Sequence, residues 1–158
     1  MCMYSSDTIR IEEDELLVAF KLNKLMLNDE NPKLSNCIKK KVTKNNVLTI
    51  YSLAKLYKLA TFFNACLVYV ERCFPIVVET KNFLHLDFSL VKKILNSSDL
   101  NIHSEIEVFN AVINWLKHNS EERSKYAKQL LLKVRLSLLS EHALKYAFDK
   151  VLLFFEKK

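Results

Sequence analysis

Four cysteines and four histidines are the residues of this sequence best suited to metal binding or nucleophilic chemistry: Cys2, Cys37, Cys66, Cys73, His85, His103, His118 and His142. A structural zinc site usually takes cysteines about two to four residues apart, or two histidines on one turn of a helix. Neither spacing occurs here. Cys66 and Cys73 instead share one apolar helix face, where a cysteine behaves as a small hydrophobic residue. The sequence predicts neither a metal site nor a disulfide framework.

The absence of glycine removes most of the backbone devices that bind phosphate or expose a nucleophile. Average usage would place about eleven glycines in a chain of this length, and this chain has none. The Walker loop, the dinucleotide fingerprint, the serine-hydrolase elbow and the EF-hand loop all need glycine and are excluded. A lone histidine near a predicted helix end, such as His118, is typical of a favourable terminal charge. We expect no catalysis and no cofactor.

The charge pattern favours a solvated surface over nucleic-acid binding. The formal net charge is +6, with 20 lysines and 4 arginines among the basic residues. The densest basic run, residues 38–44, lacks the arginines and interleaved aromatic rings typical of a nucleic-acid-binding face. No apolar run approaches the roughly 18 residues that cross a bilayer, and the start does not resemble a secretory signal. We expect a soluble, cytoplasmic protein without membrane or specific nucleic-acid partners, and a nuclear location stays open.

Apolar residues recur at helical spacing along most of the chain, which predicts an all-α fold. The expected helices cover residues 12–27, 34–42, 47–54, 61–74, 88–96, 104–118 and 120–131, followed by a last helix through residue 155. Residues 3–11 are β-branched and turn-like, and they suggest one short strand. Short links join the helices, a pattern typical of stacked antiparallel helix pairs.

Polar residues in front of the apolar stripes predict where several helices begin. Asn46, Thr61 and Ser120 are the expected N-caps of three helices. Pro75 should end or kink the helix that starts near Thr61, because proline lacks the amide hydrogen that a helix interior needs.

The segment SEIEVFNAVINWLKHNSEER, residues 104–123, fits a capping box followed by a buried helix. Ser104 can accept a hydrogen bond from a first-turn amide while Glu107 reaches back to the amide of Ser104 itself. The apolar stripe behind this start includes Trp115, the chain's single tryptophan, as an expected core residue.

Four successive stretches of the chain carry distinct motifs. They are NVLTIYSLAKLY (46–57), FFNACLVYVERCF (62–74), FLHLDFSLVKKILNSSDLNIHSEIEVFNAVINWLKHNSEER (83–123) and LLLKVRLSLLS (130–140). Together they resemble the BACK domain, the helical module that follows the BTB domain in BTB–BACK–Kelch proteins. The resemblance includes the Ser-Glu helix start, the helix that carries the tryptophan and a Val-Arg pair. This chain differs from the family pattern at Ser137, where proline is usual, and at Lys58, where a glycine-containing turn is common.

By the same resemblance, residues 1–43 correspond to the C-terminal end of a BTB domain, and residues 44–158 to the BACK domain. YSSDTIRI (4–11) and DELLVAFKLNKL (14–25) stand in the places of a BTB strand and helix. The earlier BTB segments have no counterpart here, and a Kelch propeller needs glycine pairs that this chain lacks. We expect a fragment or a truncated gene product.

The resemblance implies a non-enzymatic adaptor of cullin-3-type ubiquitin ligases. In the family, the BTB domain and the helix pair after it, the 3-box, hold cullin-3, and BACK sets the distance to a substrate-binding propeller. The 3-box corresponds to residues 45–74, and four of its apolar residues are expected to line the cullin-facing groove: Leu48, Tyr51, Phe62 and Phe63. The alternative is a structural interaction module that recruits no ligase and serves in cytoskeletal assembly or as a truncated competitor.

Without the rest of a BTB domain, we expect this chain to bind cullin-3 weakly or not at all, because a shared interface loses area and anchor residues. The predicted helices of residues 12–43 would expose apolar side chains that a BTB core covers in the family: Leu16, Leu17, Phe20 and Leu25. Exposed apolar patches favour association. We therefore expect self-association through these helices.

Overall fold

The protein is a row of helices. The structure, a computed structural model, describes residue 40 and residues 42–156. The α-helices are α3 (Val47–Leu56), α4 (Ala60–Arg72), α5 (Phe74–Val77), α6 (Lys81–Leu84), α7 (Phe88–Leu95), α8 (Glu105–His118), α9 (Ser120–Arg123), α10 (Ala127–Leu131) and α11 (Glu141–Glu156), with short 3₁₀ turns η1 (Ser124–Tyr126) and η2 (Leu136–Leu138). All regular structure in this described part is helical, which confirms the all-α prediction. The strand expected at 3–11 and the helix expected at 12–27 lie outside the described residues, as does nearly all of the helix expected at 34–42.

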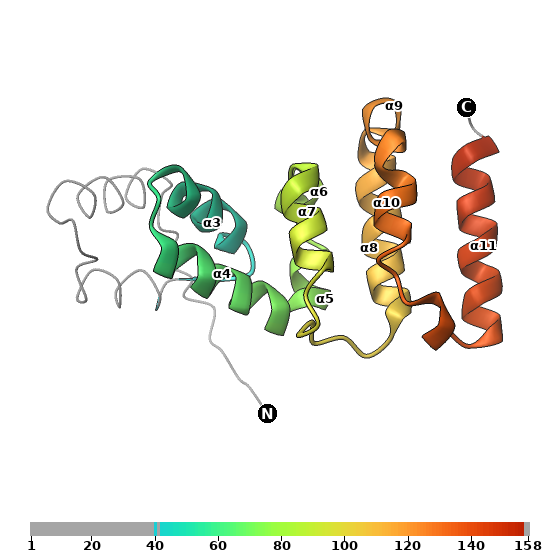
Figure 1. Cartoon of the computed structure of the whole chain (residues 1–158), viewed down its shortest axis with the longest axis horizontal. Coiled ribbons are helices and arrows are strands. Elements are labelled where there is room, and N and C mark those ends of the chain that lie inside the picture. The colour runs from blue at the N-terminus through green and yellow to red at the C-terminus, as the bar shows by residue number, and fades with distance from the viewer. Residues whose placement is uncertain (1–39, 41, 157–158) are drawn as a thin grey trace, which may run out of the picture.

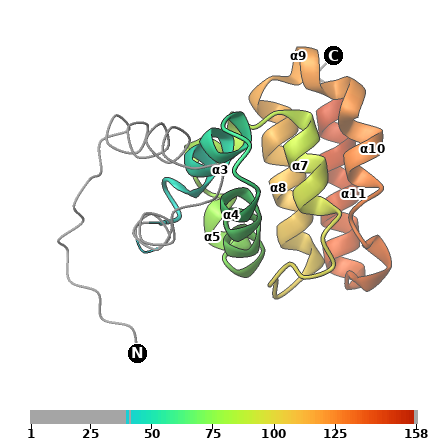
Figure 2. The same cartoon turned by 60° about the vertical axis from the view of Figure 1, so that its left-hand side comes forward.

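Neighbouring helices along the chain are also neighbours in space (Figure 1). The α3–α4 hairpin lies at one end, α5 to α7 follow, and α8, α10 and α11 stand side by side at the other end. The chain runs along α8, turns at α9, returns along α10 and reverses again into α11. Figure 2 shows the same succession from another side. One hydrophobic cluster runs through the row, from Val47 in α3 to Phe154 in α11.

The expected capping box at the start of α8 forms with one difference. The Ser104 hydroxyl accepts a hydrogen bond from the Ile106 amide at 3.4 Å. Glu107, however, accepts from the amide of His103 and not from that of Ser104, and its carboxylate also lies 3.4 Å from the His103 ring nitrogen. The carboxylate therefore reaches one residue further back than predicted, where it gains an imidazole partner.

Two predicted N-caps are wrong by one or two residues. Helix α4 begins at Ala60, so Thr61 lies inside its first turn, and Leu59 in the cap position has no side-chain acceptor. Helix α9 begins at Ser120 itself, and Asn119 is the cap, whose side chain accepts from the Glu122 amide. A cap residue usually has non-helical backbone angles, and Leu59, two residues before Thr61, and Asn119, one residue before Ser120, take that conformation here.

The chain is broken near Pro75, as predicted, and also within residues 120–131, which were expected to form one helix. Helix α4 ends at Arg72, and Pro75 falls in the first turn of α5, where a missing amide hydrogen costs little; this agrees with the predicted break at Pro75. The region 120–131 divides into α9, η1 and α10. At that break the Tyr126 ring stacks on Phe88, with ring centroids 4.1 Å apart.

Candidate partner-binding surface

The α3–α4 hairpin carries all four residues predicted to contact cullin-3, and a left-handed residue makes its turn. After α3 the Lys58 amide donates to the Lys55 carbonyl at 3.1 Å, and the Leu59 amide donates to the Ala54 carbonyl at 2.9 Å. This pair of bonds is the Schellman motif, which requires a positive φ between them. Lys58 supplies it with φ of 58°. In this chain without glycine, a lysine therefore occupies the conformation that glycine usually takes.

The structure places three of the four predicted residues in the core of this hairpin. Leu48, Tyr51 and Phe62 are buried, and Phe63 is half-buried. The rings of Tyr51 and Phe63 meet edge to face with centroids 6.1 Å apart. Lys93 of α7 brings its ammonium group 5.2 Å from the Phe63 ring centre. Phe63 is thus the member of the set that reaches the surface.

The interior of the hairpin is apolar and uncharged. Burial, and then the coulombic influence of Asp87 and Cys66, raises the pKa of Tyr51. Burial also raises the pKa of the Cys66 thiol to about 12. Both groups are therefore protonated at neutral pH. The core of the hairpin therefore carries no charge from these two groups.

The exposed apolar residues of the hairpin lie elsewhere on its helices. Leu56 is 68% exposed and Val68 is 44% exposed. Sequence reasoning missed both, because it followed the apolar stripe and took its members as site residues. An apolar residue outside the buried stripe would have been the better signal. Leu56 is such a residue, because it lies on the opposite side of α3 from Val47 and Ala54, where a polar residue is expected.

A shallow pocket of about 180 Å³ separates α3 from α6. Its lining is Leu48, Thr49, Ser52, Asn82, His85 and Leu86. The Asn82 side chain ties the two elements together by donating to the Asn45 carbonyl at 2.7 Å. Leu48 is otherwise buried, so a partner that enters this pocket would contact it.

Two motifs far apart in the sequence meet as an ion pair at the other end of the row, between α8 and the segment after α10 (Figure 1). Glu105, at the start of α8, is only 5% exposed. Its carboxylate accepts from the Arg135 guanidinium at 2.6 Å and from the Arg135 backbone amide at 3.1 Å. The Ser-Glu start and the Val-Arg pair therefore serve the fold, since they fasten the segment after α10 to the base of α8.

Trp115 is the centre of a second link between elements. Its indole nitrogen donates to the Leu86 carbonyl at 3.0 Å, and Arg123 lies 4.0 Å above its ring. The same guanidinium donates to the carbonyls of Leu84 and Trp115, both at 2.8 Å. The predicted core role of Trp115 is confirmed, and these bonds join α6, α8 and α9.

Residues 42–156 lack the ligand cluster of a metal site and the long apolar helix of a membrane span. His85 and His118 lie in edge-to-face contact with ring centroids 4.9 Å apart, but no group of three or more His, Cys, Asp or Glu in this range could hold a metal ion. Within the same residues, every helix is too short or too polar to cross a bilayer.

Comparison with known proteins agrees with this helical arrangement. A family profile described as "BTB And C-terminal Kelch", or BACK, matches residues 47–149. The chain belongs to the BACK family. Kelch repeat and BTB domain-containing protein 3 is 33% identical in Mus musculus and 32% identical in Homo sapiens, in each case over 136 residues that make up 85% of this chain. The chain spans 22% of the length of each relative.

This membership explains what the row of helices is suited to do. The BACK family and its Kelch and BTB relatives support a protein-interaction module of the adaptor type. The helices described here share one continuous hydrophobic core, and hydrogen bonds hold the connections between them. They form the rigid body of such a module.

Proposed function

We propose that this chain is the BACK part of a cullin-3-type ubiquitin ligase adaptor. In this proposal, residues 1–43 are the end of a BTB domain, residues 44–158 are the BACK domain, and residues 45–74 form the 3-box. The family match over residues 47–149 supports it, as do relatives whose names join Kelch repeats with a BTB domain. No catalytic role is assigned to the chain.

The observation that carries the proposal is the α3–α4 hairpin at one end of the row. Among the described residues, this hairpin has helices beside it on one side of the row, and we propose that its other side contacts the partner (Figure 1). Leu56 is exposed and Phe63 is half-buried on this hairpin, while Leu48, Tyr51 and Phe62 pack beneath and fix its shape.

The rest of the row acts as a spacer. Its links are anchored by hydrogen bonds, notably the buried one from Trp115 to the Leu86 carbonyl and the partly buried one from Arg135 to the Glu105 carboxylate. A continuous core with such links resists bending, because side chains in a close-packed interior have no room to rearrange. A substrate-binding domain that follows α11 would be held at a fixed distance from the cullin.

A titration of the purified chain with the N-terminal repeats of cullin-3 tests this function. We expect weak binding that Leu56→Asp and Phe63→Asp abolish. Leu132→Asp is the matched control, because Leu132 is 74% exposed and belongs to the opposite end of the row. Absence of binding at hundreds of micromolar when a BTB domain is supplied in front of residue 44 would contradict the proposal, as would equal losses in all three variants.

The alternative function, a structural module that recruits no ligase, is favoured by one observation. Leu48, Tyr51 and Phe62 are buried, so the hairpin offers a partner less apolar surface than a groove lined by all four predicted residues would offer. The same titration separates the two functions. A structural module would show no cullin-3 binding, even when a BTB domain is supplied in front of residue 44.

A further inference from the structure

Helix α11 has an apolar stripe that the described part of the chain leaves exposed. Leu144 and Leu152 are each 44% exposed, Phe155 is 47% exposed and Phe148 is 64% exposed. We call these four residues the α11 stripe. Their spacing of four, four and three residues places them on one side of the helix. Ala147 and Phe154, on another side, are buried against the core. The helix is therefore apolar on two sides, and only one of them is covered.

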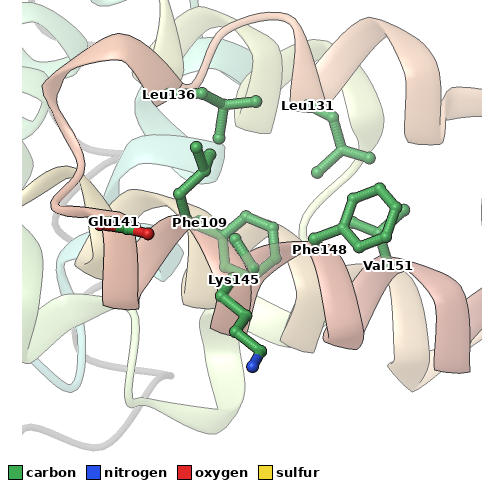
Figure 3. Close-up of a pocket in the computed structure, with 9 residues that line it drawn as sticks. Phe109, Leu131, Leu136, Glu141, Lys145, Phe148 and Val151 are labelled. Carbon is green, nitrogen blue, oxygen red and sulfur yellow. The ribbon is translucent and has the colours of Figure 1, made fainter.

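The α11 stripe borders the apolar groove shown in Figure 3. The groove has a volume of about 580 Å³. Leu131 and Leu136 form one wall, Phe148 and Val151 form the other, and Phe109 of α8 lies between them (Figure 3). Charged side chains occur at one end, where Glu141 and Lys145 complete the lining. This is the shape that takes the apolar face of one further helix.

We propose that the occupant of this groove is α11 of a second copy of the same chain, packed antiparallel. A fully exposed large apolar side chain presents about 200 Å². The exposed fractions of the α11 stripe and of Leu136, which is 40% exposed, then amount to about 500 Å² per copy. Homodimer interfaces are about 65% apolar, so two copies would bury about 1,500 Å² in total, close to the roughly 1,600 Å² of a stable interface.

The stripe is self-complementary when the two helices run in opposite directions. Leu144 of one copy then faces Phe155 of the other, and Phe148 faces Leu152, so each leucine packs on an aromatic ring. A two-fold axis generates every one of these contacts twice. Among the described residues, α8, α10 and η2 line the groove beside α11, so the second copy would contact them as well (Figure 3).

Charges flanking the stripe select the antiparallel direction. Lys145 and Glu156 are exposed and lie near opposite ends of α11. Antiparallel packing brings Lys145 of one copy to the end that carries Glu156 of the other, which makes two attractive pairs. Parallel packing would place Lys145 beside Lys145 and Glu156 beside Glu156. Such rim charges contribute little affinity but distinguish one arrangement from another.

Sedimentation velocity of the full chain over a range of concentrations tests the proposed dimer. We expect Phe148→Glu to weaken dimerisation about 30-fold or more, since it places a charge at the centre of a hot spot. Leu153→Glu is the matched control: Leu153 is 48% exposed on the same helix but outside the stripe. This variant should dimerise like the unaltered chain.

Charge reversal gives a second readout that loss of folding cannot imitate. Lys145→Glu should weaken the dimer, and the double variant Lys145→Glu with Glu156→Lys should restore it. Failure of the double variant to restore the dimer would overturn the antiparallel arrangement. A monomeric unaltered chain at high micromolar concentration would overturn the proposal altogether. So would a dimer that survives Phe148→Glu but is lost in Phe20→Glu, because the association would then belong to the N-terminal region.

Discussion

We expect the substitution Lys58→Gly to stabilise this protein, which has no glycine of its own. Lys58 is exposed and holds φ at 58° between the two hydrogen bonds that end α3. A residue with a Cβ atom pays about 1–2 kcal/mol for the left-handed region, because Cβ approaches the following carbonyl oxygen. Glycine avoids that cost but loses about 0.4–1 kcal/mol through the greater freedom of the unfolded chain. The net gain should be about 0.5–1 kcal/mol.

Urea denaturation followed by circular dichroism at 222 nm measures this difference, and the thermal midpoint should rise by about 1–4 °C. Lys55→Gly is the matched control. It makes the same replacement one turn earlier, inside α3, where glycine costs about 1 kcal/mol. Lys58→Ala shows whether the lysine side chain itself contributes, because alanine keeps the steric cost. If Lys58→Gly lowered stability as much as Lys55→Gly does, the left-handed turn at Lys58 would be refuted.

Three further outcomes follow from the packing and the titrating groups. Trp115→Ala should cost about 3–5 kcal/mol of unfolding free energy, whereas exposed Lys40→Glu should change it by less than about 0.5 kcal/mol; equal thermal midpoints would contradict the core role of Trp115. Asp87 accepts from the Leu90 amide at 2.7 Å as the cap of α7, and Asp87→Ala should cost about 1 kcal/mol at pH 7. Burial alone would raise the pKa of Asp87, but hydrogen bonds from Ser89 and Leu90 and the charge of Lys55 outweigh it and lower that pKa. The stability that Asp87 contributes is therefore present above its unfolded pKa of about 3.9. It should be lost as the pH falls through the lower pKa of the folded state. Acid titration of the unaltered chain and of Asp87→Ala, followed by circular dichroism, measures this loss. In a variant with Cys2 and Cys37 replaced by serine, a thiol reagent should label half-buried Cys73 much faster than buried Cys66. The pKa of Cys66, about 12, leaves very little of the reactive thiolate. Equal labelling rates would show that Cys66 is accessible.

The helices could be predicted from the sequence because burial and periodicity agree along most of the chain. The stripe that ends at Trp115 and Leu116 is buried in α8 as its spacing predicts, and the helix expected at 88–96 is α7. Cap positions were harder to predict. Thr61 and Ser120 lie within two residues of the true caps, and side-chain type alone does not determine which residue takes non-helical angles.

The candidate site was less predictable for a different reason. Leu48, Tyr51 and Phe62 show the same spacing whether they line a groove or fill a core, so periodicity cannot separate the two roles. The ion pair of Glu105 with Arg135 joins residues 30 positions apart, and only the family resemblance singled out both of them. The positive φ of Lys58 could not come from residue type, because lysine rarely takes this conformation.

The single tryptophan has a consequence for optical experiments on this protein. Its indole ring is buried midway along the row, beneath the Arg123 guanidinium and 6.4 Å from the Tyr126 ring. Intrinsic fluorescence excited at the red edge of the absorption band therefore reports only on the middle of the molecule. Emission should shift to longer wavelength when α8 separates from the Leu84–Leu86 segment, and it should stay constant while either end of the row gains or loses a partner. A label at Leu56 or at Phe148 would be needed to see those events.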